Sequence, residues 1–241
     1  MAQVEATATI ASLRQKMRQI EAKSAAVGEG ASQIKESVRV APVPQWLAGH
    51  LPGGGVARGQ ATQISDCPAV LVDVLAHLTA RGMCVAVVDY PRLAIAAVAA
   101  AGGDVERLVL VPDSTPHTAA VLGTLIEGMD VVLFAAGGQG ARGMQRGAVP
   151  PTFARPVEAR LRKSECALLV CGRAWPQARM HVELQVCGVL GLRRGSGRIR
   201  AVEVEGRVWG KAQPPSAVRA TIGAEEAMGA ESAAEVGEQW A

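Results

Sequence analysis

Aromatic side chains are scarce in this chain, which has two Phe, one Tyr and four Trp, or 3% of its 241 residues. Since 49% of the residues are hydrophobic, a packed core is expected, and Ala, Val and Leu must build most of it. No apolar run reaches the ~18 residues of a membrane span. The N-terminus lacks the basic and apolar regions of a secretory signal. We therefore expect a cytoplasmic protein without membrane contact.

Cysteines are few and have no paired spacing. The five are Cys67, Cys84, Cys166, Cys171 and Cys187, and they are expected to be small buried residues in a reducing compartment. A zinc site at Cys166 and Cys171 would need closer spacing and a nearby His. We expect no bound metal.

Charge is divided unevenly along the chain. Residues 220–241 hold five Glu and no Lys or Arg, so removing them from the net charge of +3 leaves +8 on residues 1–219. Residues 139–200 hold twelve basic and three acidic residues, mostly as Arg, the better side chain for forked contacts to phosphate. A basic body with an acidic tail indicates nucleic acid or an acidic partner, although an Arg preference of the genome would give the same count.

Apolar, β-branched runs alternate with helical patterns from residue 51 onward. Such runs are typical of strands buried on both faces, in a parallel sheet with crossover helices. We predict strands over 61–64, 85–89, 108–111, 131–135 and 167–171. We predict helices over 68–81, 91–101, 115–127 and 153–163. The later runs, 181–189, 199–204 and 207–209, are separated by Arg/Gly turns and are typical of antiparallel strands.

An amphipathic helix is predicted over residues 8–27, since Leu13, Met17 and Ile20 recur at helical spacing. A polar, Pro-containing stretch follows, so we assign 1–45 to a helical arm and linker, 46–219 to the core and 220–241 to an acidic tail that we expect to be disordered. The arm either packs on its own domain or docks on a second protein.

The first strand–helix junction, Ile64 to Asp73, lacks the features of a phosphate-binding loop. Such a loop needs Gly for backbone approach, Lys for the phosphate charge and Ser or Thr for Mg²⁺. The segment offers no Gly, no Lys and no hydroxyl at the helix start, and its Asp66 and Asp73 would repel a triphosphate. We also find no pattern of Ser with a nearby base, and Asp89 at a strand end is typical of a residue that caps a turn.

The order of elements and several stretches over residues 46–212 resemble the RecA ATPase core. The resemblance is carried by Leu51–Gly59 before the first strand, Asp89–Ala94, Leu108–Ser114 and the apolar strand Asp130–Ala135. It implies an α/β fold with a RecA-like, mostly parallel sheet flanked by helices, antiparallel C-terminal strands and an N-terminal helix.

The departures from the RecA pattern fall on the residues that carry its chemistry. Val72 and Asp73 stand for the phosphate-loop Lys and Thr, Pro91 for the catalytic Glu and Ala135 for the metal-supporting Asp. With Asp66, these positions mark a degenerate nucleotide site. Loss of three separate roles is hard to reconcile with ATP hydrolysis, so we expect no enzyme activity and no cofactor.

A degenerate RecA core behind a short helix resembles the ImuA family of the bacterial mutasome, including the mycobacterial form ImuA-prime. The stretch Ile10–Lys23 is similar to the opening helix of that family. The resemblance implies a non-catalytic adaptor in SOS-induced translesion synthesis and mutagenesis, nucleoid-associated when engaged. Its partner would be the inactive Y-family polymerase homologue ImuB, with the error-prone polymerase DnaE2 supported indirectly. The arm would contact ImuB, a second copy of this chain or RecA.

Two loops of RecA-like proteins face DNA, and here they correspond to 136–152 and 172–180. We predict DNA contacts at Arg142, Arg146, Arg173 and Arg179, with Trp175 stacking on an exposed base. A solvated basic rim, or a surface for an acidic partner, would show the same pattern.

Trp240 near the end of the acidic tail is predicted to anchor a partner, together with Leu13, Met17 and Ile20 of the arm. A tail folded back on the basic face would explain it equally well. Two other functions stay open. One is a SulA-like inhibitor of cell division that binds FtsZ, and the other is an enzyme with an unrecognised nucleotide site.

Overall fold

The computed structural model describes residues 40–137, 147–192, 199–211 and 213–223. Contacts divide the chain into Met1–Val38 and Arg39–Ala241, and the fold described here is that of the second unit. The predicted arm helix at 8–27 and most of the predicted acidic tail lie outside the described residues.

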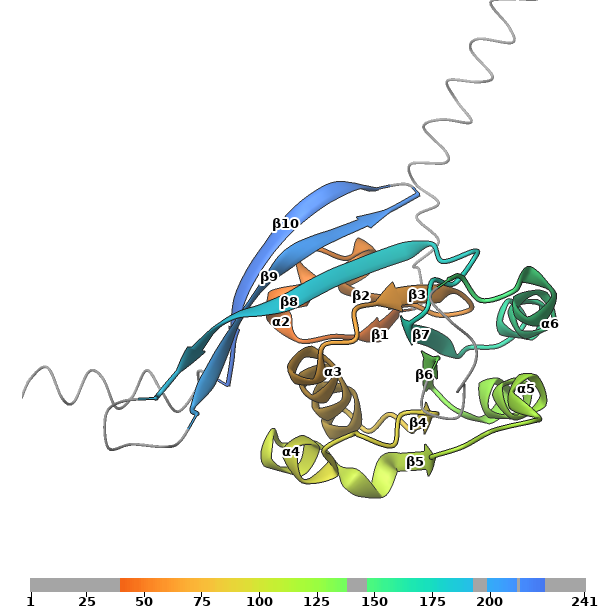
Figure 1. The fold of residues 1–241 in the computed structure, drawn as a ribbon, viewed down its shortest axis with the longest axis horizontal. Helices are drawn as coiled ribbons and strands as arrows, with labels where there is room; N and C mark the ends of the chain where they lie inside the picture. The colour runs from red at the N-terminus through yellow and green to blue at the C-terminus, as the bar shows by residue number, and fades with distance from the viewer. Residues whose placement is uncertain (1–39, 138–146, 193–198, 212, 224–241) are drawn as a thin grey trace, which may run out of the picture. The chain divides into compact units, whose positions relative to one another are not determined.

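An eight-stranded sheet forms the centre of the fold, in the order β10-β9-β8-β3-β7-β6-β4-β5 (Figure 1). Its strands are β3 (Ala61–Ile64), β4 (Val85–Val88), β5 (Leu108–Val111), β6 (Val131–Ala136), β7 (Ala167–Gly172), β8 (Met180–Leu190), β9 (Ala201–Gly210) and β10 (Gln213–Ile222). The strands from β3 to β8 pair in parallel, and β8, β9 and β10 pair antiparallel. This confirms the predicted fold class, a mostly parallel α/β sheet that ends in antiparallel strands.

Helices cover both faces of the parallel part of the sheet (Figure 1). One face packs against α3 (Pro68–Ala80) and α4 (Ile95–Ala100), and the other against α5 (Thr118–Gly128) and α6 (Pro151–Leu161). Strands β4 and β6 are buried along their whole length. Their uninterrupted apolar sequence follows from this burial, because a strand covered on both faces has no solvent-facing positions.

A small two-stranded sheet precedes the core. It pairs β1 (Val40–Pro42) with β2 (Gly55–Ala57), and the segment between them contains α2 (Gln45–Ala48) and the 3-10 turn η1 (Pro52–Gly54); a second 3-10 turn, η2 (Val105–Arg107), precedes β5. Ala41, Val43 and Leu47 are buried in the main core. The end of the predicted linker, residues 40–45, is therefore part of the folded body, because its apolar side chains pack there.

The antiparallel strands differ from prediction in length and number. The two short runs predicted at 199–204 and 207–209 form the single strand β9, and β10 was not predicted as a strand. Pro214 and Pro215 stand at the start of β10, where a register shift accommodates them. The predicted tail therefore begins later than residue 220, since β10 continues to Ile222.

The helix α3 carries two ionisable groups one turn apart. Asp73 accepts a hydrogen bond from the Trp46 indole N–H at 2.8 Å, and burial raises the pKa of its carboxyl above the usual range. Burial, aided by the nearby charge of Arg81, lowers the pKa of His77, whose Nε2 is buried without a hydrogen-bond partner in the described structure.

The lowered pKa of His77 predicts a loss of stability in mild acid. The unfolded imidazole takes up a proton near pH ~6.5, whereas the folded protein holds it neutral, so this contribution is complete above that pH and is lost as the pH falls through it. We expect the urea midpoint, followed by circular dichroism, to fall between about pH 7.5 and about pH 6. His77→Gln should reduce this fall and His117→Gln should not. An unchanged slope in His77→Gln would contradict the assignment.

Candidate functional site

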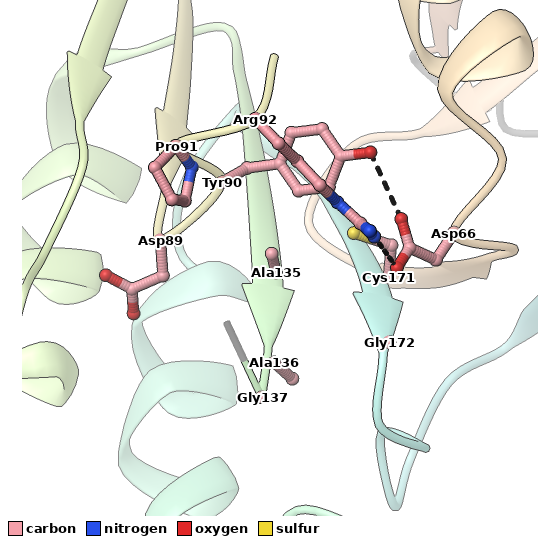
Figure 2. A pocket seen from close by; sticks show the side chains of 10 residues that line it. All are labelled: Asp66, Asp89, Tyr90, Pro91, Arg92, Ala135, Ala136, Gly137, Cys171 and Gly172. Carbon is pink, nitrogen blue, oxygen red and sulfur yellow. Dashed lines mark hydrogen bonds and ion pairs between the residues drawn. The ribbon is translucent and has the colours of Figure 1, made fainter. Parts of the chain in front are cut away.

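A crevice of about 270 Å³ opens at the carboxyl ends of the parallel strands (Figure 2). This edge is where open α/β sheets bind their ligands. The floor is formed by the ends of β6 and β7, which carry Ala135, Ala136, Gly137 and Gly172. These residues are small, so their side chains leave the space above the strand ends open.

A charged cluster closes one side of the crevice. Asp66, which follows β3, forms an ion pair with Arg92 and accepts a hydrogen bond from the Tyr90 hydroxyl at 3.1 Å (Figure 2). The Arg92 guanidinium also lies 5.0 Å from the centroid of the Tyr90 ring. The carboxylate is therefore occupied by two side chains of the same protein.

Tyr90 and Cys171 of the crevice are held in their neutral forms. Burial, with the nearby charge of Asp66, raises the pKa of the Tyr90 hydroxyl to about 12. The same two causes raise the pKa of the Cys171 thiol to about 12. A thiol held neutral at pH 7 is a poor nucleophile, so the crevice offers hydrogen-bond donors but no activated attacking group at these two residues.

Asp89 lies at the opposite side of the crevice and its carboxylate points away from Asp66 (Figure 2). It accepts hydrogen bonds from the backbone N–H and the hydroxyl of Ser114, both at 2.8 Å. Its backbone has a φ of 58°, an uncommon conformation that Asp tolerates better than most residues. The Asp89 carboxylate thus links the ends of β4 and β5 instead of capping the turn that follows it.

The junction between β3 and α3 consists of Ser65, Asp66 and Cys67. The backbone N–H of Ser65 donates to Val182 at 2.8 Å, and that of Cys67 donates to the Ser65 carbonyl at 2.8 Å. The next residue, Pro68, has no N–H. Two of the amides that a phosphate loop would direct at its ligand are thus bonded within the protein.

The predicted degenerate site is only partly assembled in space. Asp66, Pro91 and Ala135 line the crevice together. Val72 and Asp73 do not, and their assignment as the phosphate-loop positions was wrong by about one helical turn. The helix begins at Pro68, so both lie beyond its first turn, where Val72 packs on the core and Asp73 binds Trp46.

The prediction that Trp175 stacks on a base is also wrong. The side chain is 3% exposed and packs edge-on against Phe134 and Phe153 at 6.4 and 6.3 Å. Its indole N–H donates to the buried Glu158 carboxylate at 2.8 Å, and its backbone N–H donates to the Gln63 side chain. These bonds fold the loop inward, so its aromatic residue joins the core.

The predicted basic contacts divide into two groups. Arg179 is exposed and Arg173 is partly exposed, with its guanidinium donating to the carbonyl oxygens of Gly147 and Ala148. The remaining predicted contacts lie outside the described residues, and they are Arg142, Arg146, Leu13, Met17, Ile20 and Trp240.

Sequence reasoning missed Tyr90, Arg92 and Cys171 as crevice residues, and it missed an exposed ring pair on the antiparallel strands. His181 and Trp209 stack at 5.1 Å between centroids with an interplanar angle of 7°. The strand-end position of Tyr90 and Arg92 is a signal that could have placed them at this edge. The ring pair depends on strand register, which periodicity does not reveal.

The described residues contain no group of three or more His, Cys, Asp and Glu side chains arranged to hold a metal ion. Among them there is also no helix with the length and apolarity needed to span a bilayer.

The fold and its crevice define an α/β protein with a mostly parallel sheet, antiparallel C-terminal strands and a strand-end crevice whose carboxylate Asp66 is bonded by its own side chains. Residues 49–177, more than half of the chain, match the model of the MT3502 N-terminal domain family, so the chain belongs to that family. The uncharacterized protein Rv3395c of Mycobacterium tuberculosis is 31% identical over 171 residues, which is 71% of this chain and 74% of that protein.

Two solved structures also match, each at 12% identity. The KaiC-like protein PH0186 of Pyrococcus horikoshii has a TM-score of 0.45, with 75% of this chain and 94% of that one covered. The flagellar accessory protein FlaH of Methanocaldococcus jannaschii has a TM-score of 0.36, with 70% and 92% covered.

The burial of Trp175 predicts a role in stability. Trp175→Phe removes the donor to Glu158 and leaves a buried carboxylate without its partner, so we expect the free energy of unfolding to fall by about 1–3 kcal/mol. Trp209→Phe, at a partly exposed position, should change it by less than about 1 kcal/mol. Denaturant unfolding followed by circular dichroism measures both. Equal effects of the two variants would argue against the buried position.

Proposed function

We propose that this protein is a non-catalytic RecA-like adaptor in SOS-induced translesion DNA synthesis and mutagenesis. It binds an ImuB-type inactive polymerase homologue, supports DnaE2 indirectly and works in the cytoplasm at the nucleoid. The proposal rests on the similarity of the sequence to the ImuA family and on the state of its strand-end crevice.

The observation that supports a non-catalytic role is that the backbone amides and the carboxylate of the β3–α3 junction are already bonded within the protein. The backbone N–H groups of Ser65 and Cys67 donate to carbonyl oxygens of the protein itself, and the Asp66 carboxylate forms an ion pair with Arg92. A nucleotide would have to displace these bonds and would then meet a carboxylate beside its phosphates. Such a site favours a structural role for the junction over phosphate binding.

An exposed apolar surface supports a role in binding a protein partner. The hairpin-end patch consists of Val186, Val189, Leu190, Leu192 and Ile199, each 40–56% exposed. The pairing of β8 with β9 has a register shift between Val186 and Gly188. Val186 therefore lies opposite Val204 and Val189 opposite Val202, on the face of the sheet that carries the main core. The far ends of β8 and β9 extend beyond the described helices (Figure 1), so none of these helices covers the face there. Exposed apolar side chains gathered near the end of a hairpin are typical of interaction sites.

The non-catalytic assignment predicts no response to ATP. We expect the purified protein to hydrolyse ATP with Mg²⁺ no faster than buffer. We also expect ATP to leave the melting temperature unchanged. If ATP did bind the folded protein, a concentration of 100 times its Kd would add about 2.7 kcal/mol of stability and raise the melting temperature. Asp66→Asn, which removes the repelling charge, serves as the comparison. Hydrolysis above background that disappears on mutation of the crevice would overturn this assignment.

The partner assignment predicts retention of ImuB by the hairpin-end patch. Co-purification of tagged ImuB with the full chain should succeed, and the double variant Leu192→Glu with Ile199→Glu should reduce the retained amount at least tenfold, because each Glu would have to be desolvated at the interface. Val109→Glu, at an exposed position of β5 (44%), is the matched control.

Removal of residues 1–40 separates the contribution of the arm from that of the patch. Failure of the wild-type chain to retain ImuB would remove the central mechanism of the proposal. Retention of FtsZ in its place would point to a cell-division inhibitor.

A further inference from the structure

The stacked rings of His181 and Trp209 stand on a part of the sheet face that none of the described helices covers (Figure 1). The two residues are direct cross-strand partners on β8 and β9. Their neighbours Val182 and Val208 are buried in the core, so His181 and Trp209 project from the opposite face of the sheet. Both rings are partly exposed, which is unusual for two of the few large planar side chains in this chain.

The stack is fixed in place by a second cross-strand pair. Arg207 lies 4.9 Å from the centroid of the Trp209 ring, and its guanidinium is held by Glu183 on β8 at 2.9 Å. Burial lowers the pKa of His181, which favours the neutral form of this imidazole. The result is a preorganised, flat surface that loses little conformational freedom when a planar ligand stacks on it.

A second pocket of about 270 Å³ adjoins the stack. His181 and Trp209 form one wall, and Gln63, Ser65, Gly172 and Ala174 at the ends of β3 and β7 form the opposite side. Its volume is several times the ~30 Å³ share of one water molecule. It therefore has room for a planar ring lying beside the imidazole.

Basic residues adjoin the pocket lining along the chain, with Arg179 two residues before His181 and Lys211 two residues after Trp209. The backbone N–H of Lys211 donates to the Arg179 carbonyl at 3.1 Å, which places the two exposed basic residues next to one another. Arg173 follows Gly172 of the pocket wall. The two carboxylates at the pocket, Asp66 and Glu183, are each paired with an Arg.

We propose that this platform, formed by His181, Trp209 and Arg207, binds single-stranded nucleic acid by stacking one of its bases, with Arg179 and Lys211 on the adjacent phosphates. A flat aromatic surface beside a basic rim is the combination by which proteins hold single strands without reading sequence. Base pairs inside a duplex do not expose their faces and cannot use it. An acidic peptide without aromatic residues has no planar ring to place on the stack.

The platform gives the proposed adaptor a direct contact with DNA and rests on that proposed function. It also moves the predicted base stacking from Trp175, which is buried, to the ring of His181, which Trp209 supports from behind. Because it needs no polymerase partner, it can be tested with the purified full chain alone.

The test compares two oligonucleotides of equal length and charge, one of thymidines and one of abasic units, by fluorescence anisotropy at about 50 and 200 mM salt. We expect the wild-type protein to bind the base-bearing strand about tenfold more tightly than the abasic strand. Both affinities should fall with salt, because phosphate contacts release counterions. A uridine strand in parallel distinguishes RNA from DNA as the natural occupant.

Three variants assign the effect to the platform. Trp209→Leu should bind the thymidine strand about tenfold more weakly and lose the preference over the abasic strand, whereas Trp209→Phe should keep that preference. Arg207→Gln should weaken binding to the base-bearing strand, and the matched variant Arg219→Gln, whose Arg also pairs with a Glu on the neighbouring strand, should not. Circular dichroism confirms that each variant is folded.

Equal binding of base-bearing and abasic strands by the wild-type protein would overturn the proposal, and this comparison requires no variant. No binding of either strand at low salt would overturn it as well. Loss of ImuB retention with the base preference intact would contradict the partner assignment and leave the platform standing.

Discussion

The parallel pairing of β3 with β8 is the interaction on which the rest of this molecule depends. It joins the parallel core to the antiparallel strands through the register Gln63 opposite His181 and Ile64 opposite Val182. At its end the Ser65 amide donates to Val182, and the Ser65 hydroxyl accepts from the Leu184 amide at 3.0 Å. One short strand pair thus bonds the backbone of the junction at the position where a phosphate-binding loop would keep its amides free. It also decides which residues of β8 turn inward.

The two proposed surfaces follow from that register. With Val182 and Leu184 directed into the core, His181 and Glu183 must lie on the opposite face, beside Trp209 and Arg207 of β9. Val186 and Val189 of the hairpin-end patch continue the core-facing side where the strands extend past the described helices. One hairpin therefore presents a polar aromatic face and an apolar face, which suits contact with two different macromolecules. The crevice at the strand ends shares Asp66 and Gly172 with the pocket beside the platform and shares no residue with the patch.

The parallel core could be predicted from the sequence because its signals are local. Apolar runs such as Val131–Ala136 indicate strands buried on both faces, and the order of strands and helices then limits the topology. Features that depend on contacts between residues far apart in the sequence could not be predicted. Trp175 lies in a loop, and sequence alone does not show that Glu158 and Gln63 draw it inward. The pairing of His181 with Trp209 likewise depends on the register of two strands. The strand β10 was missed because its Pro pair argues against a strand.

Those two prolines have a consequence for how copies of this protein meet. β10 and β5 are the outer strands of the described sheet, and an open edge invites pairing with the same edge of another molecule. Pro214 and Pro215 remove two N–H donors from the edge of β10, and the exposed Arg219 adds a charge further along it. At the other side β5 offers four residues. The sheet is thus protected against growing from one molecule into the next, and the long hairpin can stay exposed without seeding aggregation along its edge.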